Sequence, residues 1–143
     1  MLMLPTFRND PRVKLVAAAA PRAESRAAFE AEFGGSGYAS VEEMAADPEV
    51  EAVYIATPHQ MHAAHVAAVA AAGKHILVDK PLSVTMEDAD KMVEAARSAG
   101  VYLIVGPSHS FDPPVVHASQ IIESGQFGAV RMVQAFNYTD FLY

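Results

Sequence analysis

The sequence contains no cysteine and no basic run. Without cysteine the chain can form neither disulfides nor cysteine-ligated zinc sites. A formal charge of −7, with no cluster of lysine or arginine, argues against a nucleic-acid-binding surface. The opening run Met1–Leu4 is stopped by Pro5 and is too short for a signal peptide or a membrane span. These absences predict a soluble, cytoplasmic protein that binds neither nucleic acid nor membrane.

What the sequence does contain is an alternation of short apolar segments with helix-forming segments. Such an alternation predicts an α/β fold with a parallel sheet and helices on both of its faces. The 143 residues suffice for one domain with its own core but are short for a two-domain enzyme. The expected helices are 1–9, 22–33, 40–47, 61–72, 86–99 and 113–124, and the expected strands are 13–20, 38–39, 50–57, 75–79, 101–105 and 130–138.

The stretch from His75 to Ser83 organises the rest of the chain. An apolar strand, 76–78, is followed at once by Asp79, Lys80 and Pro81. Ligands of parallel α/β sheets bind just beyond the carboxyl ends of the strands. Lys80 could therefore donate a hydrogen bond or proton to an alcohol or carbonyl oxygen, or it could be a solvated turn residue. Burial would favour the neutral amine and Asp79 the ammonium form, and both readings stay open. The Lys80–Pro81 bond is predicted to be cis.

Three expected strands end in polar or turn residues. These ends are Thr57-Pro58-His59, Asp79-Lys80-Pro81 and Gly106-Pro107-Ser108-His109. Because parallel strands end at the same edge of a sheet, the three motifs are expected to line one cleft. His109 is a candidate for the polar lining of a substrate pocket, and an ordinary loop histidine is the alternative.

The histidines His59, His62 and His65 have a spacing that could suit a metal ion. On a helix, an i, i+3 pair can reach the same ion. His59, however, is expected to precede the helix, and no carboxylate is nearby to complete the site. No metal site is predicted, and helix capping or cofactor contact is the favoured reading of these histidines.

Two of these motifs resemble the glucose–fructose oxidoreductase/inositol dehydrogenase (Gfo/Idh/MocA) family. The segment 56–62, ATPHQMH, is similar to the family's A-T-P-N-x-x-H, and Asp79–Pro81 is similar to its E-K-P. Segments 109–115 and 137–143 more weakly resemble members that act on aromatic cis-dihydrodiols. The resemblance implies an N-terminal Rossmann domain, NAD or NADP as cofactor, and Lys80 as the catalytic residue beside the nicotinamide and a substrate hydroxyl. The positions that it assigns to cofactor binding are Ala20, Arg22, Ala56, Thr57, Pro58, His59, His62, Asp79, Lys80 and Pro81.

The chain also departs from the family pattern. The first strand and the glycine-rich turn G-x-G-x-x-G would precede residue 1, and the catalytic D-x-x-x-H motif would follow the last residue. Ala20 stands where the family carries an acid for the adenosine ribose, and Arg22 nearby favours a 2′-phosphate and hence NADP. The expectation is a chain truncated at both ends: a partial NAD(P)-binding domain over 1–125 and the start of a substrate and oligomerisation domain over 126–143.

Two functions are compatible with this pattern. The first is an NAD(P)-dependent oxidoreductase, of impaired activity, acting on a small sugar, cyclitol or dihydrodiol-like substrate. The second is a non-catalytic remnant that serves as an oligomerising or interaction module. Without a central first strand, segments 13–20 and 53–57 are expected either to pair directly or to recruit a second copy, because unpaired strand edges invite pairing. A homo-oligomer is therefore expected.

Overall fold

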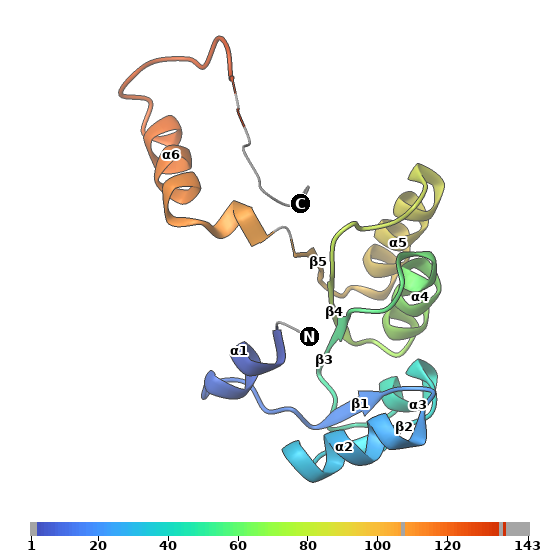
Figure 1. The fold of residues 1–143 in the computed structure, drawn as a ribbon. Coiled ribbons are helices and arrows are strands. Elements are labelled where there is room, and N and C mark those ends of the chain that lie inside the picture. Colours follow the sequence, from blue (N-terminus) through green and yellow to red (C-terminus); the bar gives the residue numbers. More distant parts are fainter. Residues whose placement is uncertain (1–2, 107, 135, 137–143) are drawn as a thin grey trace. The chain divides into compact units, whose positions relative to one another are not determined.

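The computed structural model describes residues 3–106, 108–134 and 136, with the side chains of 108 and 109 also outside the description (Figure 1). Two compact units divide after Gly106. The first holds α1 (Met3–Asn9), β1 (Ala17–Ala19), α2 (Ala23–Phe33), β2 (Ser36–Tyr38), α3 (Val41–Ala45), β3 (Ala52–Ile55), η1 (His59–Met61), α4 (His62–Ala71), β4 (His75–Val78), α5 (Met86–Ala99) and β5 (Leu103–Val105). The second holds η2 (Ser108–Phe111) and α6 (Pro113–Glu123).

All strand pairs in the first unit are parallel, which confirms the predicted α/β fold. β1 pairs with β2, and β3, β4 and β5 form a separate sheet in that order. Ile55 lies opposite Val78, and Val78 lies opposite Val105, so the carboxyl ends of these three strands are aligned. Four of the predicted strands, 13–20, 50–57, 75–79 and 101–105, are longer than those observed. The strand predicted at 38–39 begins two residues earlier, at Ser36, and ends at Tyr38.

Helix boundaries follow the local capping residues. The Ser40 hydroxyl accepts the backbone N–H of Glu43 at 3.1 Å and begins α3. The Thr85 hydroxyl accepts the N–H of Asp88 at 3.1 Å and begins α5, which ends at Gly100 with a left-handed φ of 69°. These side chains satisfy amide groups that a helix leaves without an internal partner. The predicted bounds of α5, 86–99, are confirmed.

The core of the first unit lies on one face of the β3–β4–β5 sheet. Val66 and Val69 from α4 and Met92 from α5 are almost fully buried there. Figure 1 shows α4 and α5 side by side against this sheet. The opposite face carries Tyr54 and Ile104, and Ile104 is 54% exposed. Helices were predicted on both faces of the sheet, but this second face is only partly covered. There α1 places Phe7 edge-on to Tyr54, with ring centroids 5.5 Å apart.

A cavity of about 340 Å³ separates β1 from β3. Its lining is largely apolar and includes Ala17–Ala19 of β1, Phe7 of α1 and Val53–Ile55 of β3. Within the described residues β1 pairs only with β2, and β3 only with β4. The predicted direct pairing of segments 13–20 and 53–57 is therefore wrong. Apolar side chains from α1, α2 and α3 (Leu4, Phe29 and Met44) border the space between the strands.

The second unit has little packing of its own. None of the residues of α6 is buried, and Val130, Met132 and Val133 are at least half exposed. The strand predicted for 130–138 is wrong for residues 130–134, which form no strand; 135 and 137–138 lie outside the described residues. An apolar sequence does not form a strand by itself, because a strand needs a hydrogen-bonded neighbour. The predicted domain division at 125/126 stays a prediction.

Candidate functional site

Two polar segments leave the sheet side by side at its carboxyl edge. β3 ends at Ile55 and continues into Thr57, and β4 ends at Val78 and continues into Asp79. The Asp79 N–H donates to the Ile55 carbonyl at 2.9 Å and extends the pairing one residue past the strand. Parallel pairing thus brings the first two predicted motifs together. The N–H of Gly106, the first residue of the third motif, donates to the Val78 carbonyl at 3.0 Å.

His62 connects these two segments. It is the first residue of α4 and is fully buried. Its Nε2 lies 2.9 Å from the carbonyl oxygen of Thr57, and its Nδ1 lies 3.1 Å from that of Pro81 and 3.2 Å from that of Leu82. With no exposed surface, His62 can influence a cofactor only through the backbone that it holds.

Thr57 also contacts the next histidine of α4. Its Oγ1 lies 3.0 Å from Nδ1 of His65. Burial lowers the pKa of His65, and the neighbouring His62 acts in the same direction, while Glu42 opposes them. The effect is a His65 ring biased toward its neutral form at the border of the β1–β3 cavity.

Lys80 and Pro81 are exposed at the end of β4, and their peptide bond is cis, as predicted. The Lys80 backbone N–H donates to Oδ1 of Asp79 at 2.8 Å. This contact fixes the first residues of the turn. The Lys80 side chain is left accessible to a molecule bound over the sheet edge.

Tyr54 is a polar group at this edge that the sequence analysis missed. Burial raises the pKa of Tyr54, and the Asp79 carboxylate adds to the effect. The phenol is thereby kept in its neutral form, able to donate a hydrogen bond. A tyrosine in an otherwise apolar strand, next to a strand that ends in an acid, was the signal available in the sequence.

The end of β1 carries the residues predicted to meet the adenosine side of a cofactor. The Ala20 N–H donates to the Tyr38 carbonyl at 3.0 Å, and Arg22 is exposed at the N-cap of α2 with no side-chain capping bond. Arg26, which the sequence analysis did not single out, donates to the carbonyls of Ala20 and Pro21 at 2.8 and 2.9 Å. The Arg26 guanidinium therefore holds the loop that presents Arg22.

The other residues predicted for the site make few contacts with the residues described above. Ala56 is half-buried, Pro58 is exposed, and the exposed His59 ring lies edge-on to His62 with centroids 5.8 Å apart. His109 belongs to the second unit, and its side chain lies outside the described residues. Within the described part of the chain, no three histidine or carboxylate side chains come together as a possible metal site.

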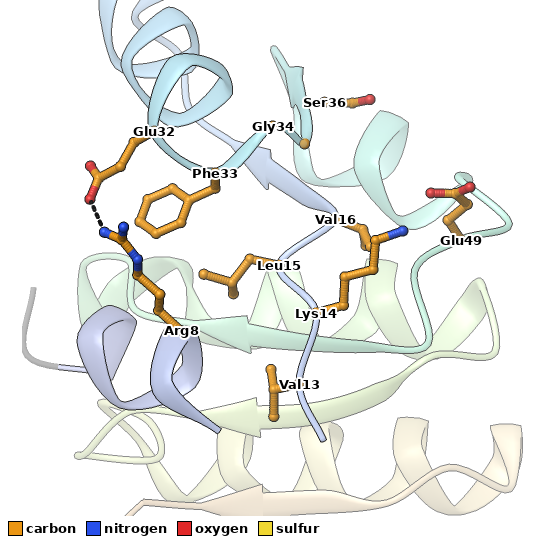
Figure 2. Close-up of a pocket in the computed structure, with 11 residues that line it drawn as sticks. Arg8, Val13, Lys14, Leu15, Val16, Glu32, Phe33, Gly34, Ser36 and Glu49 are labelled. Atoms are coloured by element: carbon orange, nitrogen blue, oxygen red, sulfur yellow. Dashed lines mark hydrogen bonds and ion pairs between the residues drawn. The ribbon is translucent and has the colours of Figure 1, made fainter. Parts of the chain in front are cut away.

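A second cavity of about 340 Å³ lies at the amino end of β1, whereas the candidate site lies at the carboxyl ends of the strands (Figure 2). Charged side chains from α1, α2 and the loops border it, and Arg8 pairs with Glu32 at 3.3 Å. Lys14 and Val16 precede β1, so this cavity lies at the amino end of the strand. Its position removes it from the edge at which α/β sheets bind ligands.

The parallel sheets, with polar groups at their carboxyl edge, define the class of dinucleotide-binding α/β domains. The chain belongs to the Gfo/Idh/MocA family, the oxidoreductase family with an NAD-binding Rossmann fold, which residues 2–107 match. This confirms the family resemblance seen in the sequence. Within the described residues, no helix is long and apolar enough to cross a membrane.

Three known proteins illustrate the similarity. The chain is 51% identical over its whole length to a 1-carboxy-3-chloro-3,4-dihydroxycyclo hexa-1,5-diene dehydrogenase of Comamonas testosteroni, of which it covers 36%. A solved structure from Bordetella bronchiseptica RB50 is 44% identical, with a TM-score of 0.90 over 99% of this chain and 37% of the other. The WlbA dehydrogenase of Bordetella pertussis, solved with NADH and UDP-GlcNAcA, is 32% identical, with a TM-score of 0.74 over 82% of this chain and 34% of the other. The chain thus spans about a third of the length of each.

Proposed function

We propose that this chain forms part of the nicotinamide-binding domain of an oxidoreductase that acts on a hydroxyl-bearing carbon, with Lys80 as the proton-transfer residue. The observation that carries the proposal is the exposed Lys80 at the carboxyl end of β4, aligned with the Thr57 end of β3. A bound nicotinamide would supply the acceptor for a hydride. Ligand binding at this edge is the general rule for parallel α/β sheets.

The chemistry of Lys80 follows from its two protonation states. As a neutral amine it would take the hydroxyl proton of an alcohol while the carbon that bears the hydroxyl gives its hydride to a bound nicotinamide and becomes a carbonyl carbon. In the reverse direction the ammonium returns a proton to the carbonyl oxygen. Tyr54, whose pKa is raised by burial and by Asp79, stays a neutral donor within the same strand-end region.

The described residues fit the nicotinamide half of a dinucleotide better than its pyrophosphate. Between residues 3 and 106, the segments that follow the carboxyl ends of the strands are 20–22, 39–40, 56–58, 79–85 and the single residue Gly106, and none holds more than one glycine. A pyrophosphate normally approaches a glycine-rich turn at a helix N-terminus. We therefore propose that these 143 residues bind the cofactor weakly and turn over little substrate.

The substrate we propose is a diol on a six-membered ring or a related sugar. Support comes from the name of the Comamonas relative, a dehydrogenase of a dihydroxycyclohexadiene, which covers the whole of this chain at 51% identity. A homo-oligomer is part of the proposal.

NADP is proposed as the preferred cofactor. Ala20 provides no carboxylate for a ribose 2′-hydroxyl, and the exposed Arg22 beside it is available to a 2′-phosphate. In the variant Arg22→Ala, binding of NADPH should weaken while binding of NADH changes little. Arg97→Ala, an exposed arginine on α5, is the control. Equal binding of both cofactors by the unmodified chain would contradict this preference.

The test of the proposed function is saturation-transfer NMR on the 143-residue chain with NADPH, which detects weak binding. Saturation should reach the nicotinamide protons, and Lys80→Met should reduce it there more than at the adenine protons. Lys91→Met, an exposed lysine paired with Glu87 on α5, should leave the pattern unchanged. Absence of transfer to the nicotinamide, or an unchanged pattern in Lys80→Met, would overturn the proposal.

A non-catalytic interaction module is the second candidate. The observation in its favour is the cavity between β1 and β3, each of which has one unpaired edge among the described residues. This function predicts a defined oligomer together with no saturation transfer from the protein to either cofactor.

A further inference from the structure

We propose that His62 acts as a positioning residue, tying the Lys80 turn to the end of β3. Both nitrogens meet only carbonyl oxygens: Thr57 at 2.9 Å on one side, Pro81 at 3.1 Å and Leu82 at 3.2 Å on the other. The link to Lys80 chemistry rests on the proposed function. The bridge itself does not.

The bridge follows from the chemistry of the partners. Carbonyl oxygens only accept hydrogen bonds, and an imidazole ring has an N–H to donate. Because His62 is fully buried, its ring lies against these carbonyls in place of solvent. The ring is therefore held between the two segments that it contacts.

The placement of Lys80 follows from the bridge. Pro81 and Leu82, whose carbonyls His62 holds, directly follow Lys80, while Thr57 belongs to the neighbouring strand. One ring therefore limits the movement of the turn after β4 relative to the end of β3. Loss of the ring would leave three carbonyl oxygens without this donor and would loosen the segment that carries Lys80.

The positioning role is tested by hydrogen exchange at the backbone amides of Asp79 and Lys80, which bond to Ile55 O and to Asp79 Oδ1. His62→Leu should accelerate exchange at both by about tenfold. Val69→Ala, a buried position on the same helix, is the control: it lowers stability without touching the turn. If His62→Leu does not fold, His62→Gln, which keeps donors on one side only, replaces it.

The exchange rates of the His62 variant and of Val69→Ala are compared at matched thermal stability. Equal rates would show that His62 contributes only to general stability, and this result would overturn the positioning role. This readout needs no cofactor. A failed nicotinamide experiment with faster exchange would therefore refute the proposed function alone, and the reverse pattern would refute His62 positioning alone.

Discussion

Thr57, His62 and His65 show how single side chains combine the end of a strand with the start of a helix. Thr57 offers its carbonyl to His62 and its hydroxyl to His65, which is three positions further along α4. The two histidines thus lie on neighbouring turns of α4 and hold the same residue. A change at Thr57 is expected to reach both rings.

The lowered pKa of His65 gives a pH dependence that can be measured. A base whose pKa is lower in the folded state binds fewer protons there than in the unfolded chain, so stability rises with pH between the two values. His65 should favour folding above its ordinary pKa of 6.5, and this contribution should be lost as the pH falls below 6.5 toward the lowered value. Thermal unfolding of the chain and of His65→Gln at pH 7.5 and 5.5 measures the difference.

The variant is expected to lose less melting temperature on acidification than the unmodified chain. His117→Gln, on an exposed position of α6, is the control for the substitution itself, and the two variants are compared at both pH values. An identical pH dependence in His65→Gln would contradict the assignment of this titration to His65.

At the scale of elements, the β1–β2 pair depends on a close approach of backbone atoms at Gly35. A Cβ added to Gly35 would lie 2.5 Å from the Val16 carbonyl oxygen and 2.9 Å from the Phe29 ring. Val16 accepts the N–H of Ser36 at 2.9 Å, which begins the pairing of the two strands. The glycine is therefore required by the space available, since its φ is not in the left-handed region.

Gly35→Ala is expected to lower the free energy of unfolding by about 1–3 kcal/mol, because the added methyl group would have to push apart the Val16 backbone and the Phe29 ring of α2. Urea denaturation of the chain provides the measurement. Gly106→Ala is the matched control: its added Cβ would meet its nearest neighbour, the Val78 carbonyl oxygen, at 3.7 Å. A loss in Gly106→Ala as large as that in Gly35→Ala would show that close packing at Gly35 is not the cause.

At the scale of the whole molecule, the space between β1 and β3 is the most consequential feature of the first unit. The Val16 carbonyl accepts the N–H of Ser36, and the Ala20 N–H donates to the Tyr38 carbonyl. The backbone N–H and C=O groups of residues 16, 18 and 20 therefore face β2. Because backbone groups alternate in direction along a strand, those of Ala17 and Ala19 face the cavity. The corresponding groups of Ala52 and Tyr54 face it from β3, since Glu51 and Ile55 bond toward β4.

Such an open edge is expected to make the chain associate with further copies as its concentration rises. Sedimentation velocity over a range of concentrations measures this association. Ala19→Lys, which places a charge at the open edge, should reduce it, and Ala71→Lys, on the exposed end of α4, should not. A chain that stays monomeric throughout the range would contradict the expected self-association.

Local sequence signals were sufficient for the helices and for the two motifs of the candidate site. Thr85 and Gly100 mark the ends of α5 because capping bonds and a left-handed glycine act over a few residues. Lys80 and Thr57 were predicted to share an edge because parallel strands place their carboxyl ends together. Arg26 was not predicted, since its bonds to Ala20 and Pro21 depend on how α2 turns back toward β1.

The sequence alone determined which segments are helices and which polar residues follow the apolar segments, because these properties depend on neighbours along the chain. Whether an apolar segment became a strand depended on a hydrogen-bonded neighbour, and residues 130–134 form no strand. Only the tertiary structure decided which strands pair, and it left β1 and β3 apart around an apolar cavity. It also decided that His62 is buried between three carbonyls. Pairing and burial bring together residues that are distant in sequence, and the pattern of a single segment carries no record of them.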